Sequence, residues 1–206
     1  MPRLPLRDIE EALKNPAVYR QKLLLSAGGP YGPTYFGALR DTIYKFHKTN
    51  GNIVQARAYL QARLSRFLDR MRCIAMTDQF EWYAQEYLSR GWLTFETRLR
   101  VVIPLPSWVP RDLVCSGEVT RIDIVPAGGY AAWLIRSRGA QDWVQELSMP
   151  LVQHALAHGA LGAPASEIQI GIYSFAEQFV DLCNYSQTEI DQARLDLDGL
   201  LRSLGF

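Results

Sequence analysis

The sequence contains no apolar run that approaches the roughly 20 residues needed to cross a bilayer. The opening residues, Met1 to Pro5, do not begin an apolar core of signal-peptide length. Three cysteines, Cys73, Cys115 and Cys183, are widely spaced and form no C-x-x-C pair, which argues against a disulfide framework and against a zinc site. We therefore expect a protein of the reducing cytoplasm that has no contact with a membrane.

An excess of one charge is also absent, because 22 Lys and Arg balance 21 Asp and Glu. Without a global field, any site for a polyanion such as DNA or RNA has to be a local patch. No internal repeat, low-complexity segment or linker interrupts the 206 residues, of which 48% are apolar. The sequence therefore predicts one domain over 1–206, with a helical part (1–91) and a sheet-containing core (92–206).

The first half has the apolar spacing of helices, separated by Gly, Pro and Asn. A helix over 9–25 is expected to break at Asn15 and Pro16, because proline lacks a donor and restricts the residue before it. A Gly/Pro loop should follow at 28–33. Asn50 to Asn52 should end one helix and cap the next. The further helices are expected over 37–48, 53–74 and 79–90.

The second half changes to the alternating pattern of strands, beginning with Phe95, Thr97, Leu99, Val101 and Ile103. Two further β-rich runs, 113–125 and 130–137, flank a hairpin turn at 126–129. A helix over 142–158, kinked at Pro150, and strands over 167–175 and 179–183 should follow. The closing helix over 186–204 begins with Ser186 and Glu189, the two partners of a capping box.

Two segments in this half match a known nuclease pattern in order, spacing and intervening turn. The run from Gly117 to Asp123 (G-E-V-T-R-I-D) is similar to a G-x-x-D-R-I-D strand, and Trp133 to Ser137 (W-L-I-R-S) follows where D-x-K-T is expected. Over nearly its whole length the chain resembles RecB-type domains of the PD-(D/E)XK nuclease superfamily. The resemblance implies an α/β, restriction-endonuclease-like fold, in which helices flank a central mixed sheet and the N-terminal half is helical. It also implies a place in bacterial or phage DNA processing or defence.

The chemistry of that family needs two carboxylates to hold Mg²⁺ or Mn²⁺ and a lysine to orient water. In this register the three positions are Thr120, Leu134 and Arg136. Leucine offers a cation nothing, threonine offers a neutral oxygen, and arginine is a poor proton acceptor. The family's histidine position falls at Asp41, and its Q-x-x-x-Y motif is missing from 142–158. The resemblance therefore implies a degenerate, catalytically inactive nuclease domain without a metal cofactor.

Some acidic groups remain that could support a relocated site. Glu96 and Glu118 are candidates for an active nuclease dependent on Mg²⁺ or Mn²⁺. The alternative is that Glu96 pairs with Arg98 or Arg100 and that Glu118 is a solvated rim residue. Asp123 is a poor substitute, because it should point to the opposite face of its strand from Thr120.

Other motifs give weaker signals. His154 and His158 have the i, i+4 spacing of metal ligands, but no HExxH glutamate lies between them. The Gly-rich run 26–32 follows a helix instead of a strand and lacks the ending of a phosphate-binding loop. Trp82, Tyr83 and Tyr87 are expected to be core or interface residues.

Binding remains open to several partners. Arg63, Arg66 and Arg70 should line one flank of the helix over 53–74, and with Arg136 they are the candidate contacts for DNA or RNA. The alternative for these arginines is that they are solvated or paired with Asp or Glu. The partner could equally be another protein or a second copy of the chain.

Overall fold

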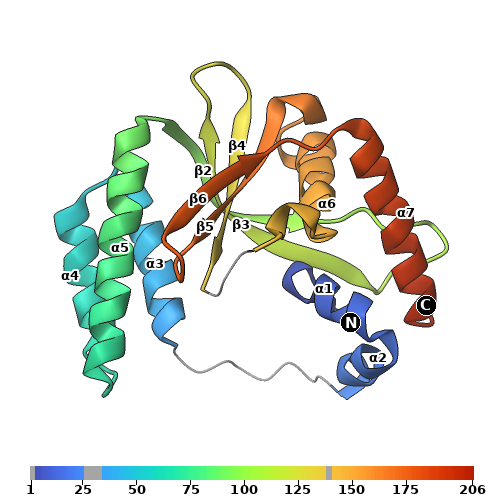
Figure 1. The fold of residues 1–206 in the computed structure, drawn as a ribbon, viewed down its shortest axis with the longest axis horizontal. Coiled ribbons are helices and arrows are strands. Elements are labelled where there is room, and N and C mark those ends of the chain that lie inside the picture. Colours follow the sequence, from blue (N-terminus) through green and yellow to red (C-terminus); the bar gives the residue numbers. More distant parts are fainter. Residues whose placement is uncertain (1–2, 26–33, 138–140) are drawn as a thin grey trace.

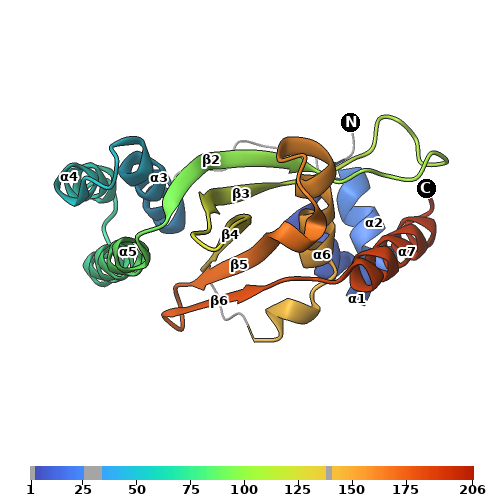
Figure 2. The ribbon, with the colours of Figure 1, turned by 90° about the horizontal axis from the view of Figure 1, so that it is seen from above.

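The computed structural model describes residues 3–25, 34–137 and 141–206, and Figures 1 and 2 show it in two views. The loop expected at 28–33 and the Gly-rich run over 26–32 lie outside the described residues. Within them, a central mixed sheet is flanked by helices, and most residues before the main strands are helical. This arrangement confirms the predicted α/β class.

The sheet contains both parallel and antiparallel pairs. β3 pairs with β2 and β4 antiparallel, β4 with β5 parallel, β5 with β6 antiparallel, and the short β1 pairs parallel with the start of β3. The helix α6 makes the crossover that the parallel pair β4 and β5 requires. The strands are β1 (Arg3–Pro5), β2 (Leu93–Val102), β3 (Val114–Ile124), β4 (Tyr130–Arg136), β5 (Ile168–Ser174) and β6 (Phe179–Cys183).

The helices lie in two groups along the chain. The first group precedes the main strands and consists of α1 (Ile9–Lys14), α2 (Pro16–Leu25), α3 (Tyr35–Lys48), α4 (Ile53–Leu64) and α5 (Arg70–Arg90). The second consists of α6 (Ser148–Ala155), which continues as a π-helical turn (Leu156–Ala160), and α7 (Gln187–Ser203). Short 3-10 turns cover Leu6–Asp8, Trp143–Gln145 and Ala165–Glu167. None of the helices in the described ranges has the length and hydropathy of a membrane span.

Each face of the sheet carries its own hydrophobic cluster. Ala131 and Trp133 of β4 pack with α3, α4 and α5, and we call this the α5 cluster. Their neighbours Ala132 and Leu134 pack with α1, α2, α6 and α7 in the α6 cluster. The alternation follows from the pleat, which turns successive side chains to opposite faces. Figure 2 shows the sheet with α3, α4 and α5 on one side and α1, α2, α6 and α7 on the other.

Several local signals in the sequence are confirmed. Asn15 separates α1 from α2, and the Asn52 side chain accepts a hydrogen bond from the backbone of Gln55 at the start of α4. Ser186 and Glu189 form the predicted capping box of α7. The β3–β4 turn contains Gly128 and Gly129, both at positive φ. A Cβ at Gly129 would lie 2.3 Å from a backbone oxygen, so this turn needs glycine for space as well as for conformation.

The single helix predicted over 53–74 is wrong. The chain turns at 65–69, and a new helix, α5, runs from Arg70 through the separately predicted helix over 79–90. Asp69 caps it by accepting from the backbone N–H of Arg72, while Phe67 packs against Tyr35 with 4.2 Å between ring centroids. The expected apolar stripe also ends here, because Leu68, Met71 and Ile74 are exposed. The apolar spacing of the sequence did not reveal that Asp69 begins a new helix.

The helix predicted over 142–158 is also divided. A 3-10 turn comes first, and α6 begins only at Ser148. Pro150 therefore lies in the first turn, where its missing N–H removes no intrahelical hydrogen bond, and it is not a kink in mid-helix. β1 was not predicted, because three residues are too few to show a period.

The first strand after the helices departs from its predicted alternation. The pairing of β2 with β3 shifts between Thr94 and Glu96, and Phe95 is exposed although it was expected to face inward with Leu99. Such a bulge turns one extra residue away from the regular face. Arg98, in the same strand, has a left-handed backbone with φ of 59°. β2 pairs only with β3 among the described strands and forms one edge of the sheet (Figure 2).

A buried ion pair joins the sheet to the helices of the α5 cluster. Arg121 and Asp123 of β3 are both inaccessible to solvent, and Arg121 Nε donates to Asp123 Oδ2 over 2.8 Å. The carboxylate also accepts from Thr94 Oγ1 and from Trp133 Nε1. Asp123 therefore points away from the α6 cluster.

The guanidinium group of Arg121 meets aromatic residues as well. It donates to the hydroxyls of Tyr83 and Tyr173, and it lies over the ring of Tyr87 with 4.7 Å between its central carbon and the ring centroid. Tyr83 is buried, and Trp82 and Tyr87 pack against the same cluster. Trp82, Tyr83 and Tyr87 therefore pack into the core on this face of the sheet, Tyr83 fully and the other two in part.

His47 of α3 completes this network in its neutral form. Burial, with the nearby positive charge of Arg121 adding to it, lowers the pKa of His47 to about 2. Its Nε2 lies 2.7 Å from the hydroxyl of Tyr83, which accepts from Arg121 and therefore donates to the histidine. The remaining proton is then on Nδ1, which faces Thr94 at 3.5 Å.

The buried neutral histidine predicts a pH dependence of stability. Between about pH 6.5 and 2, unfolded His47 binds a proton and folded His47 does not, so stability is lost as the pH falls below about 6.5. The contribution approaches about 1.4 kcal/mol per pH unit. Urea unfolding of the wild type and His47→Gln at several pH values should show a shallower dependence for the variant. If the free energy of unfolding changed equally with pH in both proteins, the assignment of a neutral His47 in the folded state would be contradicted.

Candidate functional site

The three positions that correspond to the nuclease residues lie at one end of the β3–β4 pair. Arg121 pairs with Trp133, and this register, continued by one residue, sets Thr120 opposite Leu134. Thr120 is buried, and Leu134 packs against the α6 cluster. Arg136 is two residues beyond Leu134 and so lies on the same strand face. Thr120 and Leu134 each lie directly beyond the last recorded pair of the two strands, Arg121 with Trp133.

Arg136 is held by a carboxylate of its own chain. Its two terminal nitrogens, Nη1 and Nη2, donate to the two oxygens of Glu146, with 2.8 Å for the Nη1 contact. Glu146 follows the 3-10 turn Trp143–Gln145 and precedes α6, so the connection after β4 returns this carboxylate to the end of the strand. Both side chains are largely buried. A bidentate pair of this kind fixes the guanidinium in one orientation.

A second carboxylate lies close to this pair. Glu10 of α1 accepts a hydrogen bond from the backbone N–H of Ser148, the first residue of α6, over 3.3 Å. Burial raises the pKa of Glu10, and the negative charge of Glu146 adds to the rise, while Arg136 opposes it. The site therefore contains two carboxylates and one arginine. Glu10 also satisfies a free N–H at the start of a helix.

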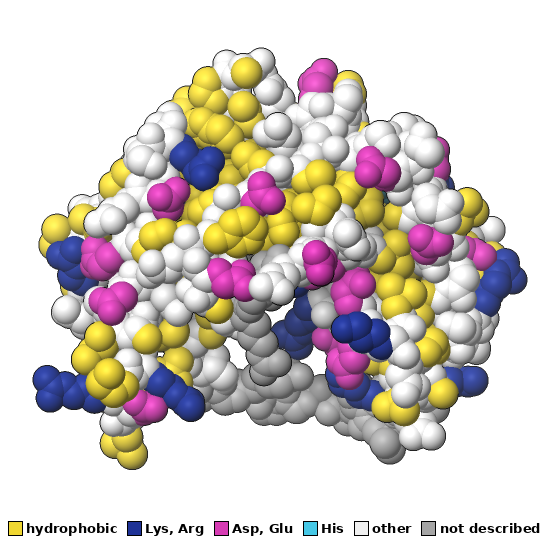
Figure 3. Space-filling model, viewed as in Figure 1, with side chains coloured by type: hydrophobic (Ala, Val, Ile, Leu, Met, Phe, Trp, Pro, Cys, Tyr) yellow, Lys and Arg dark blue, Asp and Glu magenta, His cyan; other side chains and the backbone are white. Residues whose placement is uncertain are grey.

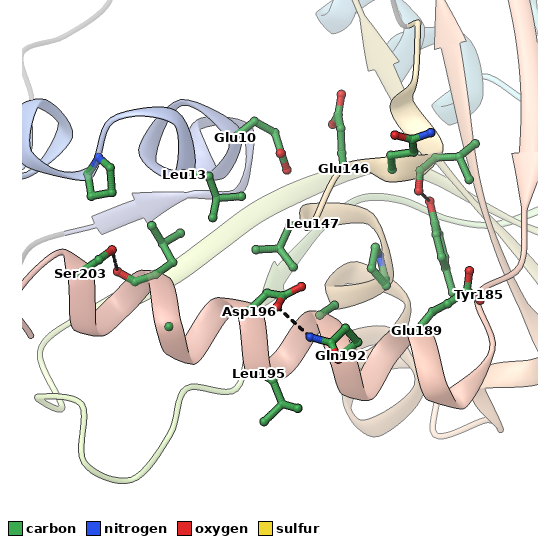
Figure 4. A pocket seen from close by; sticks show the side chains of 17 residues that line it. Glu10, Leu13, Glu146, Leu147, Tyr185, Glu189, Gln192, Leu195, Asp196 and Ser203 are labelled. Atoms are coloured by element: carbon green, nitrogen blue, oxygen red, sulfur yellow. Dashed lines mark hydrogen bonds between the residues drawn. The ribbon is translucent and has the colours of Figure 1, made fainter.

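These residues border an open groove between α1, the segment before α6, and α7. The groove has a volume of about 670 Å³, and Figure 4 shows the side chains around it. Its lining includes apolar residues and the carboxylates Glu10, Glu146, Glu189 and Asp196, and the described residues add no lysine or arginine to it. We call it the acidic groove. Its charge favours cationic groups and repels phosphate.

The two acidic candidates for a relocated nuclease site are far apart. Glu118 lies opposite Arg100, whereas Glu96 lies opposite Ile122. Four residues along a strand correspond to about 13 Å, which is too far for two carboxylates to share one metal ion.

The partners of these two glutamates also differ from those expected. Glu118 is exposed, and it accepts from Tyr44 of α3 and from Arg98 Nε, so it lies on the side of α3 and not on that of the α6 cluster. Glu96 accepts from the backbone of Thr97 and has no ion pair with any residue of the described ranges. Glu118 is therefore joined to α3 and to β2 by hydrogen bonds.

The arginines expected to line one helix flank are divided among three segments. Arg63 is in α4 and pairs with Asp41, Arg66 is in the turn, and Arg70 begins α5. Arg136, the fourth candidate, is paired with Glu146. Arg66 and Arg70 are exposed and have no ion pair in the part of the chain that the structure describes. Two of the four candidates therefore remain open to an outside anion.

The other motif positions have structural partners. Asp41, at the family's histidine position, accepts from Arg63, and Gln153 in α6 bonds the backbone of Ala165 and Tyr185. His154 and His158 stack with 4.2 Å between ring centroids, and the described residues add no third ligand. No group of three or more His, Cys, Asp or Glu side chains close enough for a metal ion occurs in 3–25, 34–137 and 141–206.

Comparison with known proteins yields structural matches alone. No protein-family model matches this sequence, and no curated protein matches it. A crystal structure named "Putative exonuclease" from Eubacterium rectale overlaps with 90% of this chain and 72% of its own, at 6% identity and a TM-score of 0.49. The crystal structure of SSO0001 overlaps with 94% of this chain and 85% of its own, at 10% identity and a TM-score of 0.37. Overlaps this weak support no argument about activity.

Sequence reasoning missed the contacts that now define the site. Nothing in the spacing between Arg136 and Glu146 indicates a bidentate pair, because it depends on the path of the connection between β4 and α6. The contribution of Glu10 depends on α1 packing beside α6. One signal was available, since Glu10 and Glu146 are acidic residues next to helix starts, where carboxylates are stabilised.

The buried half of the site can be tested through the coupling of Arg136 and Glu146. In a double-mutant cycle of Arg136→Met and Glu146→Gln, we expect a coupling of about 1–2 kcal/mol in the free energy of unfolding. The more exposed pair of Arg57 and Glu81 is also bidentate and serves as the matched control, with an expected coupling smaller than that of Arg136 and Glu146. Equal coupling in the two cycles would show that the first pair gains nothing from its burial.

Proposed function

We propose that this chain is a nuclease-type domain that has lost metal-dependent catalysis and functions by binding a macromolecular partner. The observation that carries the proposal is the ion pair of Arg136 with Glu146, at the position where the resembled family has its lysine. Beside it, Leu134 and Thr120 stand where the family has its two carboxylates. The same match of the β3–β4 hairpin to the family's motifs is our reason for assigning a restriction-endonuclease-like core.

The chemistry of these side chains supports loss of catalysis. A hard divalent cation needs several oxygen ligands, and Leu134 supplies none. The positive charge of Arg136 adds repulsion, and its pairing with Glu146 also removes it as a free contact for a phosphate. The family's cofactor therefore does not fit the residues present, and no step of hydrolysis is derived for this site.

Relocated carboxylates are a weaker explanation. Glu96 and Glu118 are separated along the sheet, and Glu118 is engaged by Tyr44 and Arg98. Glu10 and Glu146 are closer to each other. However, Glu146 is paired with Arg136, and Glu10 accepts from the backbone at the start of α6. Glu10, Glu118 and Glu146 already have partners, which leaves Glu96 as a single carboxylate.

A protein partner is favoured over DNA or RNA. Phosphate backbones are bound by clusters of lysine and arginine. Of the four arginines considered, Arg63 and Arg136 are paired with carboxylates. The groove beside the former catalytic positions is acidic. Apolar side chains are exposed near Arg66 and Arg70, which is typical of surfaces that contact proteins. Nucleic-acid binding through Arg66 and Arg70 is the second candidate.

The direct test is a cleavage assay with Mg²⁺ or Mn²⁺ on single- and double-stranded DNA and on RNA. We expect no cleavage, and we expect titration calorimetry with Mn²⁺ to detect no binding. Glu96→Ala and Glu118→Ala are the control variants. Cleavage by the wild type that either variant abolishes would establish the relocated site and overturn the proposal.

The register of the hairpin can be tested by rebuilding the site. The triple change Thr120→Asp, Leu134→Asp, Arg136→Lys should create a carboxylate pair that holds a divalent cation. Mn²⁺ should then raise the melting temperature of the triple variant but not of the wild type, because a ligand that binds only the native state stabilises it. Asparagine in place of both aspartates is the matched control. A folded triple variant with no Mn²⁺-dependent shift would contradict the register.

A further inference from the structure

A convex corner projects from the molecule where α4 turns into α5. In Figure 1 this turn lies at the lower end of the two helices, far from α7. Leu68 is fully exposed at the turn, and Met71 is largely exposed on the first turn of α5. Over residues 65–72 the corner contains three arginines (Arg66, Arg70, Arg72) and one aspartate (Asp69). We call it the basic corner.

The acidic groove has the complementary character. Its carboxylates surround apolar side chains that remain partly exposed, among them Leu13 and Val144. Leu195, on the outer side of α7, is mostly exposed at its rim (Figure 4). Glu146 is neutralised by Arg136, but Glu10, Glu189 and Asp196 have no lysine or arginine beside them in the lining. The groove can therefore accept an apolar side chain that is flanked by positive charge.

Each of the two surfaces has a hollow beside an exposed leucine. A smaller hollow of about 420 Å³ lies at the basic corner between Leu64, Phe67 and Ile74. An exposed leucine lies next to each hollow, Leu68 at the corner and Leu195 at the groove. A contact between the corner of one molecule and the groove of another brings the surface that carries Leu68 against the surface that carries Leu195. Both exposed leucines are then covered in one contact.

We propose that the acidic groove binds the basic corner of a second copy of this chain. The inference rests on the docking role proposed above and narrows it to one partner. The corner and the groove are on opposite ends of the same molecule, so a molecule does not fill its own groove (Figures 1 and 3). The contact joins two different surfaces and leaves one corner and one groove free. Such contacts build rings or open chains.

Sedimentation velocity of the wild type over a range of protein concentrations tests the association directly. We expect assemblies larger than a dimer as the concentration rises, and we expect salt to weaken them, because the charges at the rim are exposed. A wild type that stays monomeric at all concentrations would overturn the inference. The samples contain neither metal nor nucleic acid. A negative result would therefore contradict the self-association and leave the proposed loss of catalysis untouched.

Two variants, each with one damaged surface, test which surfaces meet. Leu68→Asp with Arg70→Glu damages the corner, and Leu195→Lys with Asp196→Arg damages the groove. Each variant alone should be monomeric, and a mixture of the two should stop at a dimer, because only one intact contact can form. Val54→Asp and Asp112→Arg place similar changes at exposed sites elsewhere and should assemble like the wild type. Before mixing, melting curves followed by circular dichroism should show that the two double variants and the two control variants are as stably folded as the wild type.

Three results would overturn the pairing. The first is a corner variant that assembles like the wild type. The second is a mixture that remains monomeric while the wild type assembles. The third is a monomeric wild type that binds vesicles of anionic phospholipid through Leu68, with binding lost in the corner variant. That result would assign the corner to a membrane surface instead of a second copy.

Discussion

Arg121 and Asp123 form an ion pair inside the protein, and the packing on one face of the sheet depends on it. Two charges removed from water cost several kcal/mol each unless every hydrogen-bonding group around them is satisfied. The aromatic residues of α5, the neutral His47 and Thr94 supply these partners. Residues from β2, β3, β4 and β5 therefore have to meet α3 and α5 at one point. The pair thus fixes which face of β3 is turned toward the helices.

That orientation also determines the composition of the other face. Because Arg121 and Asp123 point into the α5 cluster, Ile122 between them belongs to the face of α1, α6 and α7, as do Ala132 and Leu134 on β4. There an arginine, two glutamates and a leucine occupy the end of the hairpin. Glu146 is neutralised by Arg136, and Glu10 accepts from the backbone N–H of Ser148, so both carboxylates have partners within the chain.

The order of the strands, the hairpin turn and most helix ends could be predicted from the sequence, because each depends on residues close in the chain. Ser186 with Glu189 and Asn52 are examples. The break before α5 was missed because Leu68, Met71 and Ile74 continue a helical spacing although they are exposed. The pair of Arg136 with Glu146 and the approach of Glu10 were missed because they depend on how distant elements pack. The three positions on the hairpin were predictable, whereas their partners were not.

The left-handed residue in β2 has a consequence for the free edge of the sheet. An unpaired edge strand offers its N–H and C=O groups to any extended chain, which leads to aggregation. Arg98 interrupts the regular spacing of these groups, and the bulge at Phe95 interrupts it again only three residues earlier. A strand from another molecule can then match only short stretches of β2 at a time. The edge of this sheet therefore resists uncontrolled extension even though nothing in the described chain covers it with another strand.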